Sequence, residues 1–216
     1  MKEAEALARW NTRYAQADYL FGMEPNAFLA SQAPRIQAIG LKPGRKALSI
    51  ADGEGRNGVF LARQGLSVLS VDFSPVALEK AKRLAARAGV ELTTECADLA
   101  SWDWGSGRFD LVAAIFCQFA GADLRDAIFR RIRECLKPGG MLILQGYRPE
   151  QLKYGTGGPK EIDHLYTAQL LRRAFAGFEL PHLEEHDSEI HEGGGHHGMS
   201  ALIDMVARKP EAGLSP

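Results

Sequence analysis

The feature that most constrains this chain is an alternation of apolar, strand-like segments with amphipathic, helix-like segments that starts near residue 46. The segment KALSIA predicts a strand that runs into the glycine-rich turn ADGEGRNG at residues 51–58 and then into a helix. The same order repeats as far as MLILQGY, and the continuous apolar run FDLVAAIF is typical of a parallel strand buried on both faces. This alternation predicts a doubly wound α/β sheet.

The two ends of the chain depart from this alternation of strands and helices. Near the N-terminus, Leu7, Trp10 and Tyr14 share one face of a predicted helix, and Asn26 predicts the cap of a second helix. Near the C-terminus, LEEHDSEIH and MSALIDMVARK flank a Gly/His-rich patch and predict a long antiparallel hairpin. We therefore expect a mostly parallel sheet that is completed by an antiparallel hairpin.

Composition excludes several kinds of partner. The 216 residues are 45% hydrophobic, which is enough for one domain with a full core. Lys+Arg number 26 and Asp+Glu 27, so there is no electrostatic case for nucleic acid or an anionic membrane. MKEAEALARW carries charge where a signal peptide is apolar, and we expect a cytoplasmic protein with a small-molecule substrate. The sequence does not predict the oligomeric state. Three separated cysteines are predicted to be buried, reduced thiols: Cys96, Cys117 and Cys135.

The glycine-rich turn predicts an adenosine site. Gly53, Gly55 and Gly58 have the Gly-x-Gly-x-x-Gly spacing, and Asp72 ends the next predicted strand, where a carboxylate can accept hydrogen bonds from both hydroxyls of a ribose. A dinucleotide would place its pyrophosphate at the start of the following helix. The turn also carries two acidic residues, Asp52 and Glu54, whose charge suits a cofactor with a sulfonium better than a pyrophosphate. Either acidic side chain could instead face solvent.

Five segments in this order resemble the class I S-adenosylmethionine-dependent methyltransferases: ALSIADGEGRNGVFLA, VLSVDFSPVALEKAK, ECADL, FDLVAAIF and LKPGGMLIL. They look most like the branch that contains tellurite-resistance and thiopurine methyltransferases, and RWNTRYAQADYLFGMEPNAFL is similar to that branch's opening segment. The resemblance implies a seven-stranded, Rossmann-like sheet. It also implies a helical lid at 1–40, a methyltransferase domain at 41–210 and a tail at 211–216.

The same resemblance implies S-adenosyl-L-methionine as the cofactor. Gly53 and Gly55 would then lie against its methionine part and Asp72 would bind the ribose. Phe73 would pack beside the adenine, Asp98 and Leu99 would approach the adenine edge, and Ile115 would face the reactive end. The expected cofactor-binding set is Ala51, Asp52, Gly53, Gly55, Asn57, Asp72, Phe73, Asp98, Leu99 and Ile115. The chain departs from the family at Ser49 and Ala51, where most members have an acidic residue and a glycine, and Asp52 is a candidate to compensate.

Aromatic residues of the N-terminal segment are candidates for the substrate wall. Tyr19 and Phe21 lie in a predicted turn, which favours a lid, whereas Trp10 and Tyr14 could equally dock the first helix on the core. Arg56 and Asn57 sit at a predicted helix start, where capping is the alternative role. The substrate candidates are Trp10, Tyr14, Tyr19, Phe21 and Arg56.

Five of the six histidines lie between residues 182 and 197. Their spacing matches no zinc pattern, and we expect no metal site. One interpretation is an exposed hairpin tip near the mouth of the site. The other is a general base, His191 or His196, on a tip that folds back over the substrate.

Two further functions stay open at this point. A nicotinamide-dependent oxidoreductase would need a Tyr–Lys pair, for which Tyr154 with Lys153 or Lys160 is the candidate. A non-catalytic module would bind the cofactor without turnover.

Overall fold

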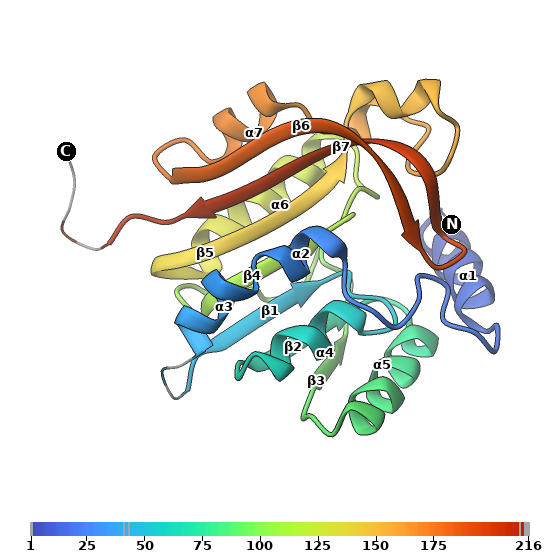
Figure 1. Ribbon diagram of the computed structural model, residues 1–216, viewed down its shortest axis with the longest axis horizontal. Helices are drawn as coiled ribbons and strands as arrows, with labels where there is room; N and C mark the ends of the chain where they lie inside the picture. The colour runs from blue at the N-terminus through green and yellow to red at the C-terminus, as the bar shows by residue number, and fades with distance from the viewer. Residues whose placement is uncertain (1, 41, 43, 212, 214–216) are drawn as a thin grey trace.

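A computed structural model describes residues 2–40, 42, 44–211 and 213, and its centre is a seven-stranded sheet in the order β3-β2-β1-β4-β5-β7-β6 (Figure 1). The first five strands are parallel, and β7 lies antiparallel between β5 and β6. The strand order reverses between β1 and β4, where open α/β sheets bind their ligands. The strands are β1 (Lys46–Ile50), β2 (Ser67–Asp72), β3 (Thr93–Cys96), β4 (Phe109–Ile115), β5 (Leu136–Tyr147), β6 (Glu179–Glu192) and β7 (His196–Arg208).

Helices cover both faces of the sheet (Figure 1). α2, α3 and α4 pack on one face, and α6 and α7 pack on the other. α1 lies beside the tip of the β6–β7 hairpin, at the edge where the parallel strands end (Figure 1). The helices are α1 (Lys2–Tyr14), α2 (Ala27–Ser31), α3 (Ala33–Gly40), α4 (Arg56–Arg63), α5 (Pro75–Ala88), α6 (Ala122–Cys135) and α7 (Ala168–Ala174), with short 3₁₀ turns η1 (Pro149–Lys153) and η2 (Ile162–His164).

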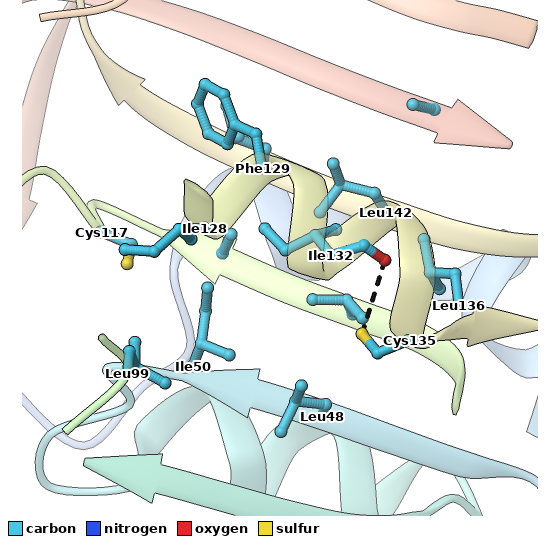
Figure 2. Close-up of a cluster of buried hydrophobic side chains, with 14 of the residues drawn as sticks. Leu48, Ile50, Leu99, Cys117, Ile128, Phe129, Ile132, Cys135, Leu136 and Leu142 are labelled. Carbon is cyan, nitrogen blue, oxygen red and sulfur yellow. Dashed lines mark hydrogen bonds between the residues drawn. The ribbon is translucent and has the colours of Figure 1, made fainter. Parts of the chain in front are cut away.

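The core follows the two-residue period of the strands. In β1, Leu48 and Ile50 point into the larger cluster, whereas Ala47 points into the cluster under α2 and α3. Figure 2 shows Ile128 and Ile132 of α6 in the larger cluster, on the same side as Leu48 and Ile50. Because every β4 residue is buried, the central strands have no solvent face, as the continuous apolar run predicts.

Local predictions for α5 are confirmed. The Ser74 hydroxyl accepts a hydrogen bond from the Ala77 N–H, Pro75 occupies the first turn, and Gly89 ends the helix with φ +67°. The Asn26 side chain caps α2 by accepting from the Leu29 N–H at 3.0 Å.

Two local predictions are wrong. β5 begins directly after α6 at Leu136, so the segment KPGG forms an irregularity inside the strand's pairing with β4 rather than a turn before it. The prediction of three buried thiols fails for Cys96, which is exposed because it lies on the short β3 at the edge of the sheet; Cys117 and Cys135 are buried. None of the helices in the described part of the chain is long and apolar enough to cross a membrane.

Candidate active site

Two strained backbone positions mark the ends of neighbouring strands. Ala51 follows β1 with φ +47°, and Phe116 follows β4 with φ +51°. These are the only non-glycine residues with positive φ in the described part of the chain. Side chains disfavour this conformation, and positions that keep it cluster at functional sites. The strain therefore coincides with the switch point in strand order.

The three glycines of the loop have different roles. A Cβ on Gly53 would meet only the Tyr14 side chain, whose hydroxyl would be 2.9 Å away, so this backbone faces the space under α1. A Cβ on Gly55 would overlap Ala81 at 2.6 Å. A Cβ on Gly58 would overlap the Asp52 carboxylate at 2.5 Å. Gly55 and Gly58 thus permit close packing on α5 and on Asp52, and the expectation that Gly55 also lies against the cofactor stays a prediction.

Asp72 ends β2 beside Gly53. Its two oxygens accept from the N–H groups of Gly53 and Ser74, both at 2.9 Å. Burial raises the pKa of the Asp72 carboxyl, and these backbone donors oppose that rise. A carboxylate has about four acceptor positions, so each oxygen retains capacity for a hydroxyl donor. The geometry suits a vicinal diol.

Asp52 lies beneath the loop rather than in the crevice. One oxygen accepts from the Ser49 hydroxyl and the other from the Ser70 hydroxyl, both at 2.7 Å, and both oxygens lie 3.2 Å from the Gly58 N–H. Complete burial raises the pKa of Asp52 to about 6. With these partners the carboxylate braces the loop from below, and Ser49 supplies a hydroxyl where the family has an acid.

Glu54 connects the loop to the N-terminal segment. Its carboxylate accepts from the Leu20 N–H at 2.7 Å and lies 2.5 Å from the Lys80 ammonium. Lys80 also donates to three carbonyl oxygens just after α1, those of residues 14, 16 and 18. Asp52 and Glu54 both have partners within the protein, so their charge does not discriminate between a sulfonium and a dinucleotide.

The residues predicted for the adenine side lie just past β2 and β3, and Ile115, predicted for the reactive end, is the last residue of β4. Leu99 and Ile115 are buried, Phe73 is half-buried, and Asp98 is exposed. One Asp98 oxygen accepts from the Ala100 N–H at 2.9 Å, which fixes the turn after β3. The sheet thus brings these four residues to the same edge as Asp72, because the carboxyl ends of parallel strands share that edge.

The N-terminal aromatics divide into two groups. Tyr14 is buried, stacks on Trp10 with ring centroids 5.4 Å apart, and lies 6.5 Å from the Phe21 ring. Burial raises the pKa of Tyr14, and the nearby Asp72 carboxylate raises it further. The Tyr19 hydroxyl donates to the Lys80 carbonyl on α5, and its place in the substrate wall stays a prediction.

Arg56 and Asn57 hold the lid segment instead of reaching open space. Arg56 forms a buried ion pair with Glu192, with Nη2 2.5 Å from Oε2. The Asn57 side-chain oxygen accepts from the Asn26 N–H at 3.0 Å. Glu192 also accepts from Asn26 Nδ2 at 2.8 Å. Their partners come from distant parts of the sequence, so the sequence could not predict these contacts, and the predicted substrate role of Arg56 and cofactor role of Asn57 stay predictions.

The hairpin tip folds back over the N-terminal segment, and its outer side is exposed, as expected, at His191, Gly193, Gly194 and His197. A Cβ on Gly193 would overlap the backbone of Gly22 at 2.5 Å, and the Gly195 N–H donates to the Leu20 carbonyl at 3.0 Å. His196 follows this tip and is buried, with 9% of its surface exposed. Its side chain therefore faces the interior of the lid.

His196 lies beside Phe21, a predicted wall residue, and beside Phe116 and Tyr147, which the sequence analysis did not assign to the wall. His196 stacks on Phe21 and on Phe116, with ring centroids 4.5 and 4.4 Å apart. Its Nδ1 lies 2.6 Å from the Tyr147 hydroxyl. Burial lowers the pKa of His196 to about 3, and the cations of Arg56 and Arg13 lower it further. The imidazole is therefore neutral at physiological pH.

The other candidates lie elsewhere. His191 is exposed and contacts His197, 3.0 Å between their Nδ1 atoms, so of the two candidate bases only His196 belongs to this wall. Tyr154 donates to Asp187 at the surface, away from the crevice where a dinucleotide would react. Within the described residues, no three His, Cys, Asp or Glu side chains are arranged to hold a metal.

Comparison with known proteins identifies this architecture. Residues 47–140 match the family model for a methyltransferase domain. Residues 47–140 are similar to that methyltransferase domain, and the fold of the chain is that of solved S-adenosylmethionine-dependent methyltransferases. The cofactor that such a domain implies is S-adenosylmethionine. The narrower resemblance to the tellurite-resistance and thiopurine branch stays a prediction.

Individual relatives of this methyltransferase domain are distant. An uncharacterized methyltransferase of Synechocystis is 33% identical over 112 residues, which are 50% of each chain. A structure from work on the conversion of a disulfide bond into a thioacetal group during echinomycin biosynthesis aligns with a TM-score of 0.74 at 17% identity, over 99% of this chain and 93% of that one. The N-methyltransferase NodS of Bradyrhizobium japonicum, with bound S-adenosylhomocysteine, aligns with a TM-score of 0.68 at 15% identity, over 95% and 98%. These structures support the fold, and the chain spans only half the length of the curated relative.

The methyltransferase site fits its cofactor on two observations. Gly53 leaves a cradle that a Cβ would fill, bounded above by a side chain rather than by backbone. Asp72 keeps acceptor capacity beside that cradle, at the strand end where a ribose is expected. The amino-acid part and the sugar part of the cofactor thus have matching surfaces next to each other.

Proposed function

We propose that this protein transfers the methyl group of S-adenosylmethionine to a small-molecule acceptor. We also propose that the part of residues 1–40 that precedes α2 serves as its lid, since α2 and α3 pack on a face of the sheet. The observation that carries the proposal is the pairing of Gly53 with Asp72 at the switch point of a methyltransferase sheet. No other pair of residues joins the loop after β1 to the carboxylate at the end of β2 in the described part of the chain.

The proposal keeps most of the predicted cofactor-binding residues in direct contact with the cofactor and gives Asp52 and Asn57 a supporting role. Asp72 would bind the ribose, the backbone at Ala51 and Gly53 would approach the methionine part, and Leu99 and Ile115 would flank the adenine and the methyl end. Asp52 and Asn57 would act indirectly, because their polar atoms already hold the loop and the start of α2.

A small acceptor is supported by the construction of the lid. α1 lies over Gly53, and the hairpin tip lies over the segment that follows α1. Such a lid would enclose the acceptor beside the reactive end, which favours a small molecule. Formal charge is balanced along the chain, with 26 basic and 27 acidic residues, which gives no attraction for a polyanion.

When bound, the cofactor supplies an electrophilic methyl group on a sulfonium. The protein's contribution is alignment and exclusion of water. Tyr14, Phe21 and Phe116 form an apolar rim around the switch point, and Glu54 with Lys80 holds the N-terminal segment against the loop. No residue of this rim is a charged base.

The test is calorimetric titration of the purified protein with S-adenosylhomocysteine and, separately, with NAD. We expect binding of the first compound only. Asp72→Ala should weaken that binding about 10- to 100-fold, because two hydrogen bonds from the ribose to a charged acceptor are lost. Asp126→Ala, at an exposed site on α6, is the matched control and should bind normally. Equal affinity of the Asp72 and Asp126 variants would refute the proposed site.

A further inference from the structure

The side chains above the strand ends form a continuous series of contacts from Gly53 to Phe116. Tyr14 lies over Gly53, Phe21 follows Tyr14, His196 stacks on Phe21, and Phe116 stacks on the other face of His196. Phe116 directly follows β4, which is the neighbour of β1 in the sheet. This series of contacts therefore connects the ends of β1 and β4, the two strands that flank the predicted cofactor crevice.

His196 supplies the polar atom of this otherwise aromatic wall. The imidazole is sandwiched between two rings, which fixes its plane, with angles of 25° to both Phe21 and Phe116. Nδ1 is occupied by the Tyr147 hydroxyl. Nε2 makes no hydrogen bond to any residue that the structure describes, although the side chain is about nine-tenths buried. Nε2 itself is not fully enclosed, so this nitrogen stays accessible to a ligand.

The contact with Tyr147 decides which ring nitrogen carries the proton. Burial raises the pKa of Tyr147, and burial lowers that of His196, so both groups are neutral. The Tyr147 hydroxyl lies beside Nδ1 and the Ser200 side chain. The imidazole nitrogen is the more basic of the two acceptors, so the Tyr147 hydroxyl donates to Nδ1. In a neutral imidazole the other nitrogen then bears the hydrogen. Nε2 is consequently a donor rather than a base.

We propose that His196 Nε2–H donates a hydrogen bond to the nucleophilic atom of the acceptor, and that the acceptor is a flat, apolar molecule that binds already ionised. This inference rests on the proposed function and names the substrate class of the same site. The acceptor's lone pair forms the new bond to the methyl carbon while the carbon–sulfur bond breaks and its electron pair stays on sulfur. No proton has to leave, so no base is required.

The charges around His196 agree with an anionic acceptor. Arg56 and Arg13 both lie close enough to disfavour a proton on the imidazole. Glu192 is the one acidic group among the neighbours that influence Tyr147, and Arg56 neutralises it within a buried ion pair. An anion beside Nε2 would therefore meet a hydrogen-bond donor and the Arg13 cation, while Arg56 and Glu192 offset each other in their ion pair.

The experiment uses 4-nitrophenol as the probe, because its anion is coloured and its neutral form is not. The full-length protein is first saturated with S-adenosylhomocysteine, and the probe is titrated optically across pH. We expect the bound probe to ionise at a lower pH than the free probe. His196→Leu should abolish this downward shift. His196→Gln, whose amide N–H can donate, should restore part of it.

The controls separate the two proposals. Tight S-adenosylhomocysteine binding in all three proteins shows that the cofactor site is intact, so failure of the proposed function would appear as loss of that binding instead. Normal cofactor binding with an unshifted or raised probe pKa, or with no bound probe, would overturn the role of His196. The role of His196 would also be overturned if the rates of methyl transfer to phenol and to 4-nitrophenol rose with one common pH midpoint rather than with each probe's own pKa. A common midpoint indicates a base in the protein.

Discussion

Arg56 and Glu192, which are 136 residues apart, form a buried ion pair with Nη2 2.5 Å from Oε2. Arg56 opens α4 directly after the glycine-rich loop, and Glu192 ends β6 at the hairpin tip. Asn26 joins the pair through Glu192 and continues to Gln145 on β5 at 2.6 Å. These buried polar contacts thus link the glycine-rich loop, the N-terminal segment and the hairpin.

Glu192→Ala is expected to destabilise the protein by about 3–5 kcal/mol, because it leaves the Arg56 guanidinium buried without a partner. Chemical denaturation of Glu192→Ala and of the exposed control Glu189→Ala measures the difference. Adding Arg56→Leu to the Glu192→Ala protein should recover part of the loss. If the double variant were less stable than Glu192→Ala alone, the buried charge would not be the cause.

Gly195→Ala should loosen the lid, because a Cβ at this position would overlap the Phe21 ring, whereas Gly194→Ala is a matched control with nothing within 4 Å of its Cβ. A core or backbone clash of this kind costs about 1–3 kcal/mol. Hydrogen exchange over residues 19–22 should accelerate in the Gly195 variant and remain unchanged in the Gly194 variant. Equal exchange in the two variants would contradict the docking of the tip on Phe21.

The stability of the protein should fall in mild acid because of His196. Its folded-state pKa is lowered from 6.5 to about 3, so the native state excludes a proton that the unfolded chain takes up below pH 6.5. The stabilisation is complete above pH 6.5 and is lost as the pH falls toward 3. Asp52, with its pKa raised from 3.8 to about 6, acts in the opposite sense, since its native state favours the proton and stability falls as the pH rises through that interval.

His196→Phe isolates the histidine contribution. Between pH 7 and pH 5, the wild type should lose about 1–2 kcal/mol more unfolding free energy than the variant, since one pKa unit corresponds to about 1.4 kcal/mol. Denaturation curves at several pH values provide the comparison. Asp52 contributes equally to the pH dependence of both proteins, so its contribution cancels in the difference. Parallel stability profiles would mean that His196 is not buried in its neutral form.

Asp52→Ala should reduce stability by about 2–4 kcal/mol, because the hydroxyls of Ser49 and Ser70 and the Gly58 N–H lose their shared acceptor. Asp52→Asn should cost less, since its side-chain oxygen still accepts and the hydroxyls can reorient. Thermal unfolding compares the two. S-adenosylhomocysteine affinity of the folded Asn variant should stay within about tenfold of the wild type, consistent with support from beneath the loop. A greater loss would indicate direct contact.

The strand–helix alternation made most of the fold predictable. KALSIA, SVLSVD and FDLVAAIF have the lengths and apolar runs of buried parallel strands, and Ser74 with Pro75 is a local signal for the start of a helix. These features depend on neighbours in sequence, so the sequence displays them directly. KPGG was misread because its glycines permit an irregular strand as readily as a turn.

Within the site, Asp72 was predictable because its position at a strand end follows from the alternation itself. The contacts of Gly55 and Asp52 were not, since spacing alone cannot tell which side of the loop packs against Ala81 or Ser70. The same applies to Tyr19, whose hydroxyl donates to a carbonyl on α5 that is distant in sequence.

The sequence by itself determined the sheet, its switch point and the carboxylate beside it, because hydrophobic period and turn chemistry are local. Tertiary structure alone decided that His196 lies between Phe21 and Phe116 and that Glu192 meets Arg56. Those contacts join residues from opposite ends of the chain, and only the folding of the hairpin over the N-terminal segment brings them within reach.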